Sequence, residues 1–213
     1  MNSQQKYRPK SIGEFVFPND EVERKIRRYT TGKATRPLIL HGPHGVGKSL
    51  LAEIIPKELE GRNVKIDYIR AEDLDSNVKV RHAFTRTKQF DRFFKPEDQD
   101  RNYTIVEEVN FDPRAKGALR TSLDDMEGRD LFIFTTNELE KLDSGLRSRA
   151  EMIEVSPVSP DRFLGRAQSI LKKEGVLLED SIVLEALEAV YSNDHDNRAY
   201  YKMIDEIIDA AGF

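Results

Sequence analysis

The most informative stretch of the chain is Gly42-Pro43-His44-Gly45-Val46-Gly47-Lys48-Ser49. It matches the pattern G-x-x-x-x-G-K-[S/T] at every fixed position. Glycines permit the tight turn that points successive backbone N–H groups at a phosphate, and the N-terminus of a following helix adds its positive dipole. We therefore predict a nucleotide-binding loop, continued by Leu50, in which Lys48 reaches the β- and γ-phosphates and the Ser49 hydroxyl binds Mg²⁺. The alternative is a chance glycine-rich turn.

The segments on either side of this loop favour the first interpretation. Residues 37–41 form a short apolar run typical of a buried strand, and residues 49–55 have apolar side chains at helical spacing, with Pro56 or Gly61 as the end signal. Further strands are predicted at 64–69, 103–106 and 131–135, and further helices at 77–94 and 112–126. Strands that alternate with helices predict a parallel α/β sheet.

Two adjacent carboxylates follow the strand predicted at 103–106. Glu107 is expected to hold the Mg²⁺ shell, and Glu108 to polarise the attacking water as a general base. Asp is the usual residue at the first position, and the extra methylene of Glu107 moves the carboxylate by about 1.5 Å. Slow hydrolysis is therefore one expectation. Asn137 ends the strand predicted at 131–135, where its carboxamide can hold the water and the γ-phosphate or can simply be a turn residue.

The composition bounds the class of protein. The 213 residues are 38% hydrophobic and 34% charged, with no cysteine and four histidines. Disulfides, thiolate zinc sites and cysteine nucleophiles are therefore excluded, and a histidine-rich metal site is not expected. No apolar run approaches the roughly 20 residues of a membrane span, and the first residues do not resemble a secretory signal. We expect a cytoplasmic protein without membrane association.

The net charge of −4 is unevenly distributed. Residues 1–150 hold 28 Lys and Arg against 25 Asp and Glu, whereas residues 151–213 hold 6 against 13. The segment 79–95 contains six basic residues and a single acid, Asp91. This segment is either a nucleic-acid contact or a solvated helix face, and both interpretations stay open.

A second domain is expected after the prolines at 157 and 160, which disfavour regular structure around residues 156–160. Helical patterns follow at 161–173, 182–191 and 197–211. We therefore expect an α/β domain over residues 1–155 and a small all-helical domain over residues 156–213.

Several motifs resemble AAA+ ATPases of the clamp-loader type. The segments that carry the resemblance are Lys6-Tyr7-Arg8-Pro9-Lys10, Phe132-Ile133-Phe134-Thr135-Thr136-Asn137, Leu146-Arg147-Ser148-Arg149-Ala150 and Asp196-Asn197-Arg198. They resemble the adenine-side segment, the sensor-1 strand, the Ser-Arg-Cys motif and the sensor-2 element of that family. The resemblance covers nearly the whole chain and is strongest to the ATPase subunit of T-even-type phage clamp loaders.

The resemblance implies a P-loop NTPase core of the AAA+ type, with a parallel sheet flanked by helices and a small helical lid. It implies that Tyr7, Arg8, Pro9 and Phe17 lie on the adenine side of ATP. Arg149, with Arg147 as its competitor, is expected to be an arginine finger that reaches the γ-phosphate of a neighbouring subunit.

The implied sensor-2 residue and the implied partners complete this picture. Arg198 is expected to contact the nucleotide from its own lid, and other AAA+ subunits, DNA and a sliding clamp are the expected partners. Candidate phosphate contacts to DNA are Lys79, Arg81, Arg114, Lys116 and Arg120.

Clamp-loader subunits continue into a helical collar, which residues 1–213 do not include. Either the chain is part of a longer protein or its assembly relies on ATP-bridged contacts alone. Two other functions stay open, namely an ATP-gated scaffold with weak hydrolysis and another DNA-linked AAA+ protein such as a helicase loader.

Overall fold

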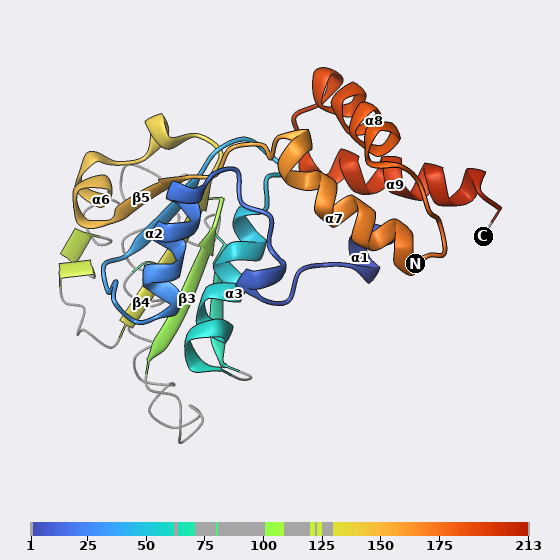
Figure 1. Cartoon of the computed structure of the whole chain (residues 1–213). Helices are drawn as coiled ribbons and strands as arrows, with labels where there is room; N and C mark the ends of the chain where they lie inside the picture. Colours follow the sequence, from blue (N-terminus) through green and yellow to red (C-terminus); the bar gives the residue numbers. More distant parts are fainter. Residues whose placement is uncertain are drawn as a thin grey trace. The chain divides into compact units, whose positions relative to one another are not determined.

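The computed structural model describes residues 2–61, 64–70, 80, 101–108, 120–121, 123–124 and 130–212. The chain divides into two compact units (Figure 1). The sheet unit comprises Arg24–Gly42 and Lys48–Glu154. The helical unit comprises Met1–Glu23, Pro43–Gly47 and Val155–Phe213, so the middle of the glycine-rich loop groups with the N-terminal segment and the last helices.

The sheet unit contains one parallel sheet. Its strands are β1 (Leu38–His41), β2 (Ile66–Arg70), β3 (Asn102–Glu107), β4 (Asp130–Thr136) and β5 (Glu151–Glu154), in the order β2-β3-β4-β1-β5. The predicted parallel α/β sheet and its first four strands are confirmed. β5 was not predicted, because its four residues begin and end with glutamate and carry no apolar run.

The central strands are buried on both faces, since every residue from Leu38 to Leu40 in β1 and from Leu131 to Thr136 in β4 is buried. On one face Ile39, Phe132 and Phe134 pack with Leu146 in a buried cluster. Helix α3 (Lys48–Glu60) also packs against the sheet and contacts β1, β3 and β4. Pro56 lies inside α3 without ending it, and the helix ends before Gly61, which has φ 70°.

Smaller elements complete the sheet unit. They are η3 (Leu139–Lys141) and α6 (Ser144–Arg149), neither of which was predicted. Of the helix predicted at 112–126 the structure describes residues 120, 121, 123 and 124, and all four are helical. The helix predicted at 77–94 lies outside the described residues apart from Val80, which is helical and buried.

Helix α2 (Asp20–Thr30) begins in the helical unit and ends in the sheet unit. Its apolar side chains Val22, Ile26 and Tyr29 recur at helical spacing and are buried. This signal is present in the sequence, although no helix was predicted there.

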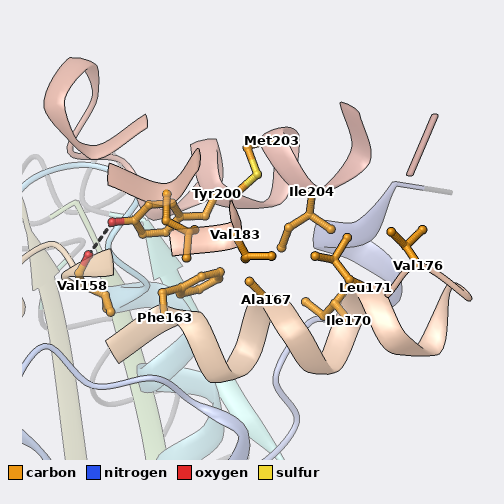
Figure 2. Close-up of a cluster of buried hydrophobic side chains, with 11 residues drawn as sticks. Val158, Phe163, Ala167, Ile170, Leu171, Val176, Val183, Tyr200, Met203 and Ile204 are labelled. Carbon is orange, nitrogen blue, oxygen red and sulfur yellow. Dashed lines mark hydrogen bonds between the residues drawn. The ribbon is translucent and has the colours of Figure 1, made fainter. Parts of the chain in front are cut away.

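The helical unit is built mainly from three helices near the C-terminus. Its elements are α1 (Ser3–Lys6), η1 (Ile12–Glu14), α7 (Pro160–Lys173), α8 (Asp180–Asn193) and α9 (Asn197–Ala210). The three predicted C-terminal helices are confirmed as α7, α8 and α9. Figure 2 shows their core, in which the Tyr200 hydroxyl donates to the Val158 carbonyl at 2.8 Å beside Phe163.

The N-terminal segment belongs to the same unit. The Ser3 amide donates to the Asp205 carboxylate at 2.9 Å, which ties α1 to α9. Within the described part of the chain, no helix is both long and apolar enough to cross a membrane.

Candidate nucleotide-binding site

The loop between β1 and α3 has the backbone that its glycines predict. Gly42, Gly45 and Gly47 have φ values of 139°, 76° and 98°, in the left-handed range that side chains rarely adopt. A Cβ at Gly45 would lie 1.7 Å from Asp196 Oδ1, and one at Gly47 would lie 2.8 Å from the Phe15 ring. Close approach and backbone conformation therefore both require glycine at these two positions.

Lys48, the first residue of α3, is buried at 8% exposure. Its Nζ donates to the Gly42 carbonyl at 2.9 Å, so the ammonium lies against the backbone of the loop. Ser49 is exposed and Leu50 is half-buried at the start of the same helix. Of the other loop residues, Val46 is buried, whereas Pro43 and His44 are exposed.

Three further predicted site residues, Glu107, Glu108 and Asn137, lie at the edge of the sheet where this loop begins. β4 lies between β3 and β1, with Thr136 opposite His41 and Phe134 opposite Val106. Because the strands are parallel, Glu107 at the end of β3 and Asn137 directly after β4 lie at the same edge of the sheet as the C-terminal end of β1. Both side chains are half-buried.

Glu108 has an unusual backbone. Its φ of 51° is the only positive value of a non-glycine residue among the described residues. A side chain in this region costs about 1 kcal/mol. The Glu108 amide donates to the buried Thr135 hydroxyl at 3.3 Å, which holds the turn in place and leaves the carboxylate exposed. Strained residues of this kind cluster at functional sites.

His41 ends β1 directly before the loop and was not predicted as a site residue. Burial lowers the pKa of His41, and nearby Lys48 lowers it further, while Glu154 and Glu140 oppose the shift. The imidazole is therefore neutral at neutral pH, so the loop begins beside an uncharged side chain. The sequence signal for a site residue at this position is that His41 directly precedes the glycine-rich motif.

The start of α9 contacts the loop within the helical unit. The Asn197 side chain donates to the Val46 carbonyl at 3.4 Å and accepts from the Val158 amide at 3.0 Å. Asp196 caps α9 by accepting from the Arg198 amide at 2.8 Å, and it also accepts from Arg198 Nε at 2.8 Å. Burial raises the pKa of Asp196, but these bonds to Arg198 outweigh it and hold that pKa below its ordinary value. Neither Asp196 nor Asn197 was predicted as a site residue.

Of the predicted adenine-side residues, Tyr7 is hydrogen-bonded to α7 and to the residue that follows it. The Tyr7 hydroxyl donates to Glu174 at 2.6 Å, and the Tyr7 carbonyl accepts from Arg166. Pro9 and Phe17 are buried. Arg8 is exposed. The segment is thus built into the helical unit, which is the unit that also holds loop residues 43–47.

The two candidate fingers lie at the end of α6. Arg149 donates from Nε and Nη2 to the two carboxylate oxygens of Asp124, at 2.6 Å and 2.8 Å. Its Nη1 donates to the Gly145 carbonyl at 3.0 Å. Arg147 is half-buried, and its Nε has no hydrogen-bond partner among the described residues. The structure thus holds Arg149 in a defined side-chain conformation.

The predicted magnesium ligands are few. Among the described residues no group of three or more acidic or histidine side chains could hold a metal ion. Mg²⁺ usually retains waters and takes only one or two protein ligands together with substrate phosphates. Ser49 at the start of α3 and Glu107 at the end of β3 fit that pattern.

Residues 38–158 match the ATPase family associated with various cellular activities (AAA). The chain belongs to this family. The match spans β1 to β5 and therefore the whole sheet with its loop.

Similar proteins agree with the family. The chain is 29% identical over 192 residues to replication factor C small subunit 2 of Pyrobaculum arsenaticum, covering 88% of this AAA chain and 56% of that protein. It is 28% identical over 194 residues to replication factor C small subunit of Archaeoglobus fulgidus, covering 89% and 59%. The chain therefore spans about half the length of the curated relatives it matches.

Solved structures share the fold. A point mutant of RuvB from Thermotoga maritima superimposes with a TM-score of 0.74 at 19% identity, covering 96% of this AAA chain and 66% of that one. The RuvB Holliday junction branch migration motor of the same organism gives a TM-score of 0.70 at 20% identity, covering 95% and 65%. The expected AAA+ core with C-terminal helices is confirmed.

Proposed function

We propose that this protein is an ATPase subunit of a clamp-loader-like assembly that acts in DNA replication. The observation that carries the proposal is the arrangement around the sheet edge. A loop with three left-handed glycines holds the buried Lys48, while Glu107, Glu108 and Asn137 follow the neighbouring strands β3 and β4. The curated relatives named replication factor C small subunit support the replication context.

Each residue of this arrangement has a proposed role. The loop amides and Lys48 bind the phosphates of ATP, and Ser49 and Glu107 hold Mg²⁺. The bound ion would supply positive charge that neutralises the phosphate oxygens. Glu108 accepts the proton of the attacking water, and Asn137 orients that water.

The remaining proposed contacts lie outside the sheet edge. Arg198 binds the phosphates from the helical unit, and the segment with Tyr7, Arg8, Pro9 and Phe17 borders the adenine. Arg149 completes the site of a neighbouring subunit, because a cation at the γ-phosphate stabilises charge that develops during transfer.

The proposed partners are further AAA+ subunits, primed DNA and a sliding clamp. Of the candidate DNA contacts, Lys79, Arg81, Arg114 and Lys116 lie outside the described residues, and Arg120 is bound to Asp143. Action on replicating DNA would place the protein in the cytoplasm, or in the host cytoplasm if a phage encodes it. The phage-type subfamily rests on the Tyr7-Arg8-Pro9 segment and stays part of the proposal.

Glu108→Gln tests the catalytic assignment. The substitution keeps the side-chain volume and the hydrogen-bonding backbone, so folding and ATP binding are expected to persist. Turnover should fall by at least about 100-fold, the usual contribution of a general base. Steady-state ATPase rates, with a nucleotide-binding titration as control, give the result. Unchanged turnover would show that Glu108 is not the base.

An ATP-gated scaffold is the second candidate, and Glu107 favours it. A longer side chain than the usual Asp displaces the carboxylate by about 1.5 Å, and such displacement can cost about 100-fold in rate. Glu107→Asp should then raise turnover. Measurement of the mass of the assembly with ATP and with a slowly hydrolysed analogue separates the candidates, because a scaffold assembles equally with both.

A further inference from the structure

Two ion pairs hold α6 against the helical residues 120, 121, 123 and 124. Arg120 donates from Nε and Nη2 to the two oxygens of Asp143, at 2.8 Å and 2.7 Å, at the start of α6. Arg149 donates to Asp124 in the same two-bonded manner at the end of α6. Arg120 and Asp124 are four residues apart, which places them on one face of a helix. Each element thus supplies one cation and one carboxylate.

The pair at the start of α6 is built into the local backbone. Asp143 is the N-cap of α6 and accepts from the Gly145 amide at 2.9 Å. A Cβ at Gly145 would lie 2.1 Å from Arg120 Nε, so glycine lets the guanidinium lie directly over the helix start. The Arg120–Asp143 pair therefore sets the position of α6 and of the arginine at its end.

The pair at the end of α6 has a different character. The Arg149 side chain is 35% exposed and the Asp124 side chain is 55% exposed. Exposed pairs of this kind contribute little to stability, because water screens the two charges. A long arginine side chain, however, loses rotamer freedom when it is ordered. Asp124 thus adds little to the stability of the fold. It does reduce the side-chain entropy that Arg149 would otherwise lose when it binds a phosphate.

The Arg149 guanidinium keeps N–H donors with which it can bind a phosphate. A guanidinium has five N–H donors. The bonds to Asp124 use Nε and one donor of Nη2, and the bond to the Gly145 carbonyl uses one donor of Nη1. Among the described residues these bonds leave one N–H donor on Nη1 and one on Nη2. A phosphate can accept hydrogen bonds from both.

We propose that Asp124 is a positioning residue for the arginine finger, holding Arg149 by one edge so that its terminal donors are ordered before they meet the phosphate of a neighbouring subunit. The inference rests on the proposed role of Arg149. Ordering of a catalytic group in advance lowers the barrier of the reaction, whereas it leaves ATP binding to the subunit's own loop unchanged.

A mixing experiment with two inactive variants tests the role in trans. Lys48→Ala supplies an intact finger but no nucleotide site, and Arg149→Ala supplies a site but no finger. Their mixture should regain ATP turnover. Addition of Asp124→Asn to the Lys48→Ala subunit should lower the regained kcat by about tenfold with KM for ATP unchanged. The same substitution in the Arg149→Ala subunit should have no effect.

Two controls separate positioning from folding. Asp20→Asn breaks a comparably short pair, Arg162–Asp20 at 2.6 Å, in the helical unit and should leave turnover unchanged in either subunit. Asp124→Glu restores a carboxylate and should recover part of the rate. The inference would be overturned if Asp124→Asn lowered the regained kcat equally in the Lys48→Ala and Arg149→Ala subunits. An unchanged or higher kcat would overturn it as well. If the mixture of Lys48→Ala and Arg149→Ala regains no turnover, the proposed finger role itself is wrong.

Discussion

The end of α6 and the start of α9 each present an arginine that is bound to an aspartate, but the two pairs differ in how the chain makes them. Arg198 pairs with Asp196, two residues away, and Asp196 is also the N-cap of α9, in which Arg198 is the second residue. Arg149 pairs with Asp124, 25 residues away on another element. Local backbone geometry thus orders Arg198, whereas tertiary structure orders Arg149.

This comparison matters for the proposed division of labour. Arg198 belongs to the unit that holds loop residues 43–47, so it is suited to its own nucleotide. Arg149 lies in the sheet unit, at the end of a helix that two ion pairs hold. This support fits the proposed role of Arg149 on a neighbouring subunit, because the two ion pairs order the arginine without a nucleotide.

The largest expected effect is that of Arg149→Ala. Loss of an arginine finger removes a cation that acts mainly in the transition state, so kcat should fall by about 10³-fold while the affinity for ATP stays the same. Single-turnover ATPase rates and a fluorescent-nucleotide titration measure the two quantities. A weaker affinity with unchanged kcat would indicate that Arg149 acts in ground-state binding instead.

Arg198→Ala should have a smaller effect of a different kind. A charge-assisted hydrogen bond to phosphate contributes about 1.5 to 3 kcal/mol, so the Kd for ATP should rise by about 10- to 150-fold. Arg198→Lys keeps the charge and should recover part of that affinity. Isothermal titration with each variant gives the Kd. If Arg198→Ala instead lowers kcat at constant Kd, the two arginines do not differ in the proposed way.

Gly145→Ala tests the support of α6. Alanine in place of a helical glycine ordinarily raises the free energy of unfolding by about 0.5 to 1 kcal/mol. At Gly145 the added Cβ would displace the Arg120 guanidinium and break its pair with Asp143, so this gain should be absent or reversed. Gly165→Ala is the matched control and should show the full gain, since a Cβ at that position in α7 meets nothing within 4 Å.

Urea unfolding of both glycine variants measures these changes. The effect of Gly145→Ala is also measured in a protein that already carries Arg120→Ala. In that background Gly145→Ala should recover the gain, because the clash and the pair are already absent. A persistent loss there would show that Gly145 is needed for its backbone conformation rather than for Arg120.

The smallest effect is the pH dependence of the α6 pairs. Hydrogen bonding to Arg120 holds the pKa of Asp143 below its ordinary value of 3.8, and Arg149 does the same for the pKa of Asp124. Depressed carboxyl pKa values give a contribution that is complete above the unfolded-state value and is lost as the pH falls through the folded-state value. Stability between about pH 5 and 8 should therefore not vary with pH through these pairs.

Thermal unfolding of the wild type and of Asp143→Asn between about pH 2.5 and 8 checks this expectation. The variant should be less stable than the wild type by a constant amount above about pH 5 and should lose less stability in acid. A difference between the two proteins that changes with pH between about pH 5 and 8 would contradict this expectation.

Much of the fold follows from short-range patterns. The glycine-rich loop, the strands before and after it and the three C-terminal helices were all predicted from residue spacing, because apolar periodicity and end signals act within a few residues. α2 carries the same kind of signal in Val22, Ile26 and Tyr29, although no helix was predicted there. β5 carried no such signal, since a four-residue edge strand is stabilised by its pairing with β1.

The residues of the candidate site likewise fall into those that a local sequence pattern marks and those that it does not. Lys48, Ser49 and Glu108 were predicted because a motif or a strand end marks them. Asp196 and Asn197 were missed as contributors, although the helix start they form was recognised. Asp124 was missed altogether, because nothing in its neighbourhood distinguishes it from other surface acids.

The sequence by itself determined the phosphate loop, the parallel α/β order and the helices that follow, because each depends on residues that are close along the chain. Tertiary structure alone decided two things: the left-handed turn at Glu108 and the pairing of Arg149 with Asp124. These features depend on residues brought together by the packing of α6 and the sheet, and the charge of an isolated side chain does not indicate which opposite charge the fold will place beside it.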